Sequence, residues 1–374
     1  MTKRNYSVDF FREIAIMSVL IYHFYCMCGN PYQNHIFLNK LLGLGGELGV
    51  TLFFIISGFG ICNSLIKMDN SGEKYTWFNF IKKRIIRIMP QYYGSLIILL
   101  LITPNSCYLN RQGLFDIVTH ALFIHNWFSA THGSISSVLW TMGTIFQFYI
   151  LSIFIFKFLK KYPWICYISS LFISISMKML FYHILVPNME IGDVGNFIYG
   201  KQIYTALDNF VVGMLLCVLL KKRETMQKSI ARIGEIIFFL LTCMWLGTLD
   251  GNWVYGDKIS GYIWHSLLAF LLMGLMYFVN YLNIEYNNFL GRIILWISKY
   301  QYGIYVWHYV VGSTLITYNA TIQRISQSNF GLFCIVMGII CIIVGYLSTI
   351  VLENNNYIEQ VFKLKEDLLG RRNF

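Results

Sequence analysis

Arg12 and His23 are the two residues whose types and spacing most clearly suggest chemistry. They lie 11 positions apart in an apolar segment near the amino terminus. At about 100° and 1.5 Å per residue, a helix would place them within roughly 20° of one face and about 16 Å apart along its axis. One stripe would carry a fixed cation at one end and, at the other, an imidazole that exchanges protons near neutral pH. Alternatively, Arg12 reaches back to a membrane interface and His23 is a hydrogen-bonded core histidine.

A second group of candidates is basic. Lys82, Lys83, Arg84 and Arg87 precede an apolar run, and Pro90 indicates a helix start close by. Arg84 and Arg87 are three positions apart, which makes them neighbours on a helical surface. Such a cluster can hold phosphate groups through charge-assisted hydrogen bonds. It can equally retain the segment in the cytoplasm and contact anionic lipids.

The other histidines and the cysteines give weaker indications. His308 lies deep in an apolar segment beside aromatic residues, where it is either catalytic or structural. The nine cysteines lie mostly inside apolar runs without paired C-x-x-C units, and the histidine spacings fit no metal site. We expect no bound metal.

The rest of the sequence shows what must position these residues. It is 56% hydrophobic and only 13% charged over 374 residues, and a soluble fold has no core large enough for so many apolar side chains. A membrane span needs roughly 20 mostly apolar residues. We therefore expect an all-α, polytopic membrane protein of about ten transmembrane helices, at residues 9–28, 47–66, 89–104, 138–159, 164–186, 203–220, 230–249, 260–282, 293–316 and 329–351.

Basic residues are distributed unevenly between the two sides of these spans. With the amino terminus in the cytoplasm, most Lys and Arg lie inside, and both termini are then cytoplasmic by the positive-inside rule. The outer side receives only Lys40, Arg111, Lys201, Lys258, Arg324 and, as a borderline case, Lys178. Outer loops near 29–46, 105–137 and 187–202 could cover an outward-facing site.

The segments between spans are too short for a separate catalytic domain. We therefore expect a single membrane domain over residues 1–374, with no fused soluble domain. Arg12 in the first apolar segment, with no cleavage site after it, argues against a removable signal peptide. The net charge of +11 is not arranged along one polar face, so nucleic acid is not an expected partner. Membrane lipid is, and the sequence leaves the oligomeric state open.

The motifs, in their order along the chain, resemble those of the bacterial acyltransferase-3 family, whose members are membrane O-acyltransferases that modify surface polysaccharides. The resemblance rests on six elements: Arg12 with His23, the segment 49–59, Arg84 with Arg87, and the segments 139–149, 208–214 and 298–308. Three positions depart from the family pattern. Thr51 replaces the usual aspartate, Ile145 replaces a glutamate of the fourth-helix signature, and Glu353 begins a reduced form of the Glu-Arg-Pro element.

The resemblance implies that the acyl donor is acyl-CoA, in the first place acetyl-CoA. The acceptor would be a hydroxyl group on a sugar of the cell envelope or of an exopolysaccharide. Arg84, Arg87, Lys82 and Lys83 would hold the CoA phosphates, and Arg12 would help to position the donor. The acceptor would be a glycan or a lipid-linked sugar on the outer side of the bacterial cytoplasmic membrane.

Acyl transfer needs a base for the hydroxyl proton and a donor for the developing oxyanion. His23 would be the general base. His308, Tyr305 or Tyr149 could donate to the oxyanion. Because position 145 is apolar, Glu47 at the outer start of the second span is the candidate orienter of His23.

Two other classes of function stay open. A membrane transporter or flippase for a glycan or acyl intermediate would also explain charged groups within spans, and discontinuous helices at matched positions would favour it. A scaffold in a glycan-synthesis complex is the third possibility. Neither would consume acyl-CoA.

Overall fold

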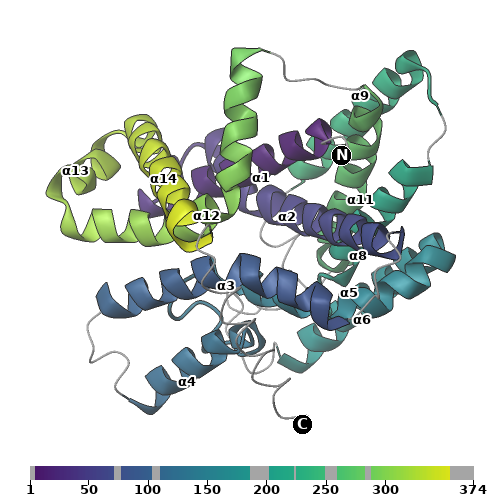
Figure 1. Ribbon diagram of the computed structural model, residues 1–374. Coiled ribbons are helices and arrows are strands. Elements are labelled where there is room, and N and C mark those ends of the chain that lie inside the picture. Colours follow the sequence, from purple (N-terminus) through teal and green to yellow (C-terminus); the bar gives the residue numbers. More distant parts are fainter. Residues whose placement is uncertain are drawn as a thin grey trace, which may run out of the picture.

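The computed structural model describes residues 5–70, 77–102, 110–185, 202–222, 225–248, 259–282 and 288–353. Over these ranges every regular element is helical, which confirms the all-α prediction (Figure 1). The elements are α1 (Tyr6–Met27), α2 (Ile36–Asn70), α3 (Trp77–Ile102), α4 (Arg111–Ala121), the 3-10 turn η2 (His125–Trp127), α5 (Trp140–Lys161), α6 (Pro163–Leu185), α8 (Leu207–Lys222), α9 (Lys228–Gly247), α11 (Ile259–Tyr281), α12 (Phe289–Tyr318), α13 (Ala320–Ser328) and α14 (Phe330–Glu353).

Each of the ten predicted spans coincides with a helix. In the described part of the chain, eight helices are long and apolar enough to cross a membrane: α1, α2, α3, α5, α6, α9, α11 and α14. The other two predicted spans correspond to α8, with 16 residues, and α12, whose tyrosines, Gln301 and His308 lower its hydropathy. The chain is a multi-pass membrane protein.

Two of the predicted boundaries are wrong. Helix α2 begins at Ile36, so most of the expected loop 29–46 is helical. Helix α3 begins at Trp77, and Pro90 therefore lies inside it instead of near its start. A span predicted from hydropathy marks only the membrane-embedded part of a helix. In α3 the lysines and arginines before the span are good helix formers and extend the helix, and in α2 the leucines of residues 36–46 do the same. The predicted loop 187–202 lies outside the described residues except for Gln202.

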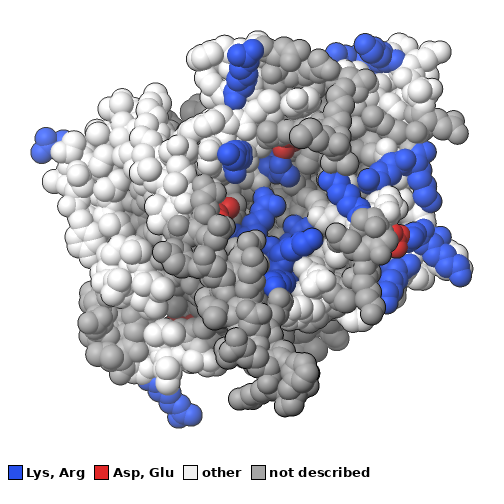
Figure 2. Space-filling view, in the orientation of Figure 1, with Lys and Arg blue, Asp and Glu red and all other residues white. Residues whose placement is uncertain are grey.

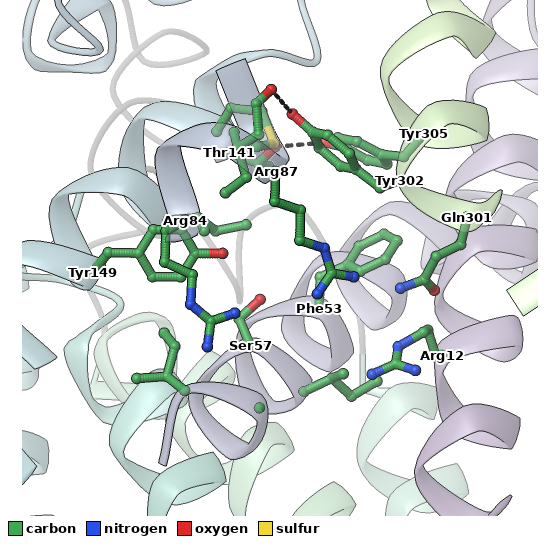
Figure 3. A pocket seen from close by; sticks show the side chains of 16 residues that line it. Arg12, Phe53, Ser57, Arg84, Arg87, Thr141, Tyr149, Gln301, Tyr302 and Tyr305 are labelled. Carbon is green, nitrogen blue, oxygen red and sulfur yellow. Dashed lines mark hydrogen bonds between the residues drawn. The ribbon is translucent and has the colours of Figure 1, made fainter. Parts of the chain in front are cut away.

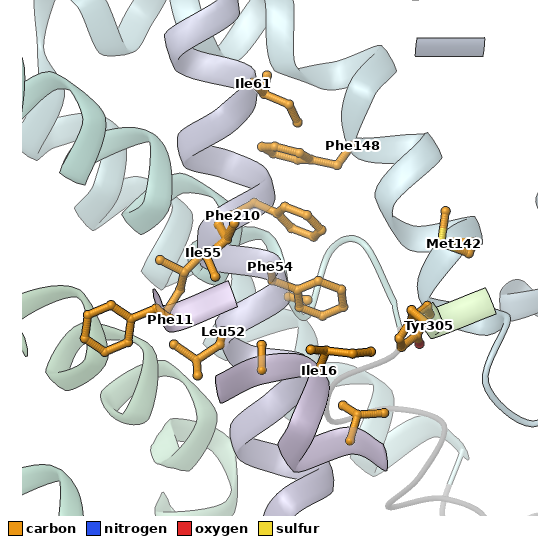
Figure 4. Close-up of a cluster of buried hydrophobic side chains, with 14 of the residues drawn as sticks. Phe11, Ile16, Leu52, Phe54, Ile55, Ile61, Met142, Phe148, Phe210 and Tyr305 are labelled. Atoms are coloured by element: carbon orange, nitrogen blue, oxygen red, sulfur yellow. The ribbon is translucent and has the colours of Figure 1, made fainter. Parts of the chain in front are cut away.

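Close helix crossings build the centre of the bundle, where α2 packs against α1 and α8. A Cβ atom at Gly58 would lie 2.0 Å from the Phe210 carbonyl oxygen, and one at Gly213 would lie 1.9 Å from the Ile55 carbonyl oxygen. Only glycine fits at either position. Next to this crossing the Phe54, Phe210 and Phe148 rings stack in series at 4.6 and 4.0 Å between centroids (Figure 4). The crossing fixes α2, which contributes to both polar regions described below.

The outer helices expose large apolar side chains. Phe172 on α6, Met244 on α9 and Ile335 on α14 are 72%, 71% and 63% exposed. Contiguous apolar exposure of this kind suits lipid contact and not water. These helices form the periphery of the bundle, and the polar groups gather inside it.

Candidate functional site

A cavity opens between α1, α2, α3, α5 and α12, with a volume of about 140 Å³. A water molecule occupies about 30 Å³ in the liquid, so the cavity has room for a short chain of atoms and not for a nucleotide. Its walls are Arg12, Phe53, Ile56, Ser57, Gly60, Ile61, Arg84, Arg87, Ile88, Thr141, Met142, Ile145, Tyr149, Gln301, Tyr302 and Tyr305.

Three arginines converge on this cavity. Figure 3 shows the guanidinium groups of Arg12, Arg84 and Arg87 directed toward one space, with Gln301 beside Arg12. The spacing of Arg84 and Arg87 puts both on one side of α3, and α1 contributes Arg12 from across the cavity. The structure thus brings together three of the predicted donor-binding residues. Basic side chains also outnumber acidic ones on the face shown in Figure 2, with several near its centre.

Contacts with polar and aromatic groups hold two of these arginines in place. Arg12 pairs with the Asp9 carboxylate one turn earlier on α1. Arg84 donates to the Ser64 hydroxyl at 2.6 Å and lies over the Tyr149 ring, 5.5 Å from its centroid. Tyr149, predicted as a catalytic residue, therefore forms part of the cavity wall next to Arg84.

Lys82 and Lys83 are not among the residues that line the cavity. Lys83 is exposed and Lys82 is half-buried on α3. A phosphate held by the arginines would meet these lysines only outside the cavity. Their predicted role in donor binding then depends on a part of the donor that extends beyond it.

Tyr305 closes one end of the cavity. Its hydroxyl lies 2.6 Å from the Thr141 hydroxyl (Figure 3) and donates to the Val138 carbonyl oxygen at 3.0 Å. The Phe53 ring packs against it, with the centroids 5.1 Å apart. Ile145, at the position where a carboxylate was expected, lines the same cavity with an apolar side chain.

Beyond Tyr305 lie two histidines that the sequence analysis selected separately. The rings of His23 on α1 and His308 on α12 are 5.1 Å apart between centroids, and Tyr305 is 5.6 Å from His308. His308 is fully buried, and its Nδ1 contacts the Tyr305 carbonyl oxygen. Its Nε2 has no hydrogen-bond partner in the described part of the chain.

The Nδ1 contact assigns the tautomer of His308. Because a carbonyl oxygen only accepts, Nδ1 carries the proton and Nε2 of the neutral ring is an acceptor. A neutral His308 therefore cannot donate to an oxyanion through Nε2. It can instead accept a hydrogen bond from a protonated neighbour, and the nearest imidazole ring belongs to His23.

The structure brings Glu47 to a different histidine from the one expected. Glu47 Oε2 lies 2.7 Å from His265 Nε2 on α11. The predicted contact was with His23, for which the structure records no hydrogen bond or ion pair to Glu47. Since 218 residues separate Glu47 from His265, no local spacing could have identified the pair.

Two further buried polar features were missed. Lys178 on α6 is fully buried, and its ammonium group donates to the Tyr262 carbonyl oxygen at 3.3 Å and to the Ser266 hydroxyl at 3.4 Å. His120 and His125 stack at 4.0 Å between α4 and η2, outside the predicted spans. Burial lowers the pKa of His120 to about 4 and that of His125 to about 3, so both rings are neutral at pH 7.

Comparison with known proteins adds evidence independent of this geometry. The profile of the acyltransferase-3 family, described as an acyltransferase domain, matches residues 5–349. A protein of Staphylococcus aureus (strain COL) named "Putative O-acetyltransferase" is 24% identical over 338 residues, which are 83% of this chain and 51% of the relative. The O-acetyltransferase OatA of S. aureus (strain NCTC 8325 / PS 47) is 23% identical over 330 residues, 81% of this chain and 50% of OatA.

The chain thus spans about half the length of these relatives. No solved structure matches it.

Proposed function

The chain belongs to the acyltransferase-3 family, and on this premise we propose that it transfers an acyl group, in the first place an acetyl group, from cytoplasmic acyl-CoA to a hydroxyl of a cell-envelope or exopolysaccharide sugar. The observation that carries the proposal is the cavity into which Arg12, Arg84 and Arg87 converge and which ends at Tyr305, next to the His23–His308 pair. The proposed location is the bacterial cytoplasmic membrane, with the arginines toward the cytoplasm.

The donor is proposed to bind with its phosphates at the arginines. Guanidinium groups bind phosphate through paired, charge-assisted hydrogen bonds, and three of them around one opening favour a polyanion. The nucleotide stays outside, near Lys82 and Lys83, because the cavity is too small for it. The thin arm that ends in the thioester then extends between Tyr149 and Ile145 toward Tyr305.

His23 is proposed as the general base. The acceptor hydroxyl oxygen attacks the thioester carbonyl carbon while its proton passes to His23. The carbon–sulfur bond then breaks, and the proton passes from His23 to the CoA sulfur. The Tyr149 hydroxyl, in the cavity wall, is the candidate donor to the oxyanion, because the Tyr305 hydroxyl already donates to the Val138 carbonyl oxygen.

The orientation of His23 falls to His308 in this proposal, because Glu47 bonds His265 and position 145 is apolar. Once His23 is protonated, both of its nitrogens are donors, and His308 Nε2 is an acceptor at the adjacent ring. The bond between His308 Nδ1 and the Tyr305 carbonyl oxygen keeps that acceptor aimed.

The test is deletion of the gene, followed by mass analysis of the surface glycans. The account predicts that the acetyl mass increment is lost, that the wild-type gene restores it, and that His23→Ala does not. His132→Ala, which changes a half-buried loop histidine that does not line the cavity, is the matched control and restores the increment. A glycan composition unchanged by deletion contradicts the proposal. Loss of surface glycan itself, with no use of acyl-CoA, would indicate a transporter or flippase instead.

A further inference from the structure

The pair formed by Glu47 and His265 is a second acid–base centre within the bundle. It joins α2 to α11, two helices that contact each other (Figure 1). The His265 side chain is 5% exposed, whereas that of Glu47 is 24% exposed. An ionisable pair inside membrane-spanning helices is costly and commonly marks a substrate path. The partial exposure of Glu47 leaves the carboxylate within reach of a ligand.

Tight packing of α2 on α1 places this pair near His23. A Cβ atom at Gly46 would lie 3.0 Å from the Tyr22 ring, and one at Gly45 would lie 2.4 Å from the Ser18 carbonyl oxygen. Tyr22 precedes His23, and their rings are 5.1 Å apart between centroids. The His23–His308 pair and the Glu47–His265 pair therefore lie at the same end of α1. His308 is next to His23, and Glu47 is on the side of Tyr22.

Other polar contacts already hold the start of α11. Lys178 donates to Tyr262 and Ser266, which flank His265. The Trp264 indole donates to the Thr248 hydroxyl, and the Trp245 indole donates to the Trp264 carbonyl oxygen. These bonds tie α11 to α6 and α9, so the Glu47–His265 pair is one of several polar contacts at this end of α11.

We propose that Glu47 and His265 form the subsite that binds the sugar acceptor of the proposed acyltransferase, so this inference rests on the proposed function. The Glu47 carboxylate accepts hydrogen bonds from hydroxyl groups of the acceptor, and His265 holds the carboxylate in place. The half-buried Tyr22 ring packs against α2 at Gly46, next to Glu47, and adds an aromatic face beside the carboxylate.

The charge of Glu47 also selects the acceptor. A carboxylate next to the bound sugar repels acidic sugars and phosphorylated glycans, and it favours neutral or amino sugars. In this proposal one hydroxyl of the sugar binds Glu47 and a different hydroxyl is acylated. The ligand class is therefore a neutral or amino sugar with at least two free hydroxyl groups.

The test uses glycan purified from the deletion strain as acceptor and isotope-labelled acetyl-CoA as donor, with the full-length protein in lipid nanodiscs. Glu47→Gln removes a charge-assisted hydrogen bond and is expected to raise the KM for glycan about ten- to a hundredfold. The KM for acetyl-CoA should stay within about twofold. The matched control is Glu235→Gln, because Glu235 is also ion-paired and its side chain is 23% exposed. It should change neither KM.

Several results would overturn the inference. An unchanged KM for glycan in Glu47→Gln would do so. A fall in kcat with an unchanged KM would do so as well, because it would indicate a catalytic or purely structural role for Glu47. If Glu47→Gln does not fold, Glu47→Asp keeps the charge but shortens its reach, and an unchanged KM for glycan in that variant overturns the inference as well. A wild-type protein that transfers no acetyl group would refute the proposed function itself, and the inference with it. An active wild type combined with an unaffected Glu47→Gln would refute the subsite alone.

Discussion

The arginine-lined cavity and the histidine-rich end of the bundle differ in how their charges are compensated. In the cavity, Arg84 and Arg87 come from a single turn of α3 and face Arg12 across the space, with the Asp9 carboxylate beside Arg12. At the other end, His265 is matched to the Glu47 carboxylate, and His308 is fixed by a backbone carbonyl. An excess of fixed cations suits an anionic donor, whereas imidazole rings with defined hydrogen-bond partners suit proton transfer.

The largest expected effect comes from removing the proposed base. His23→Ala should lower the rate of acetyl transfer by about 10²–10⁴, because loss of a general base typically has that effect. Binding of acetyl-CoA, measured by calorimetry in nanodiscs, should remain, since the arginines are intact. A folded His23→Ala protein with wild-type turnover would refute the division of labour between the two regions.

The second prediction concerns removal of the arginine cations from the cavity. Arg84→Gln combined with Arg87→Gln should weaken CoA binding by about 2–4 kcal/mol, if each arginine makes one phosphate bond and the two effects do not fully add. Arg232→Gln is the control and should have a small effect, because Arg232 is an exposed arginine on α9 that does not line the cavity. Equal CoA affinity in the double variant and the wild type would return the arginines to a purely topological role.

The arginine cluster could be predicted because its information is local. A spacing of three residues on one helix and of 11 on another placed Arg12, Arg84 and His23, and apolar runs located the ten long helices of the described residues. Contacts between distant segments could not be predicted. Glu47 was expected beside His23, and Lys178 was assigned as a borderline residue of the outer side. A hydropathy profile shows that a charged residue is present, but it does not show which residue pairs with it. Only the fold shows that Lys178 is buried against α11.

A third prediction concerns α2, which serves both regions. Gly213→Val should destabilise the protein by roughly 1–3 kcal/mol or more, because its side chain would overlap the Ile55 carbonyl on α2. Gly338→Val, at a position on α14 with no atom within 4 Å, should be nearly neutral. Thermal unfolding in nanodiscs measures both. Equal melting temperatures would show that α2 and α8 are not held at the distance described.

A fourth prediction concerns the response of the buried His120–His125 pair to acid. Burial lowers the pKa of both rings, so protons bind the unfolded chain first. The contribution of this pair to the free energy of unfolding is therefore fully present above about pH 6.5. It falls as the pH drops toward 4, by roughly 1–2 kcal/mol per histidine at pH 5. Melting temperatures at pH 7 and pH 5 test this. His120→Gln with His125→Gln should reduce the difference, and an unchanged difference would assign the acid response to other groups.

The most direct test of the account follows one labelled acetyl group through the purified wild-type protein. Acetyl-CoA carrying an isotope in its acetyl group is incubated with the protein in nanodiscs and with glycan from the deletion strain. The account predicts labelled O-acetyl groups on the glycan and release of CoA thiol in equal amount, with both lost in His23→Ala. Thiol release without label on the glycan, or label transferred equally well by His23→Ala, would contradict it.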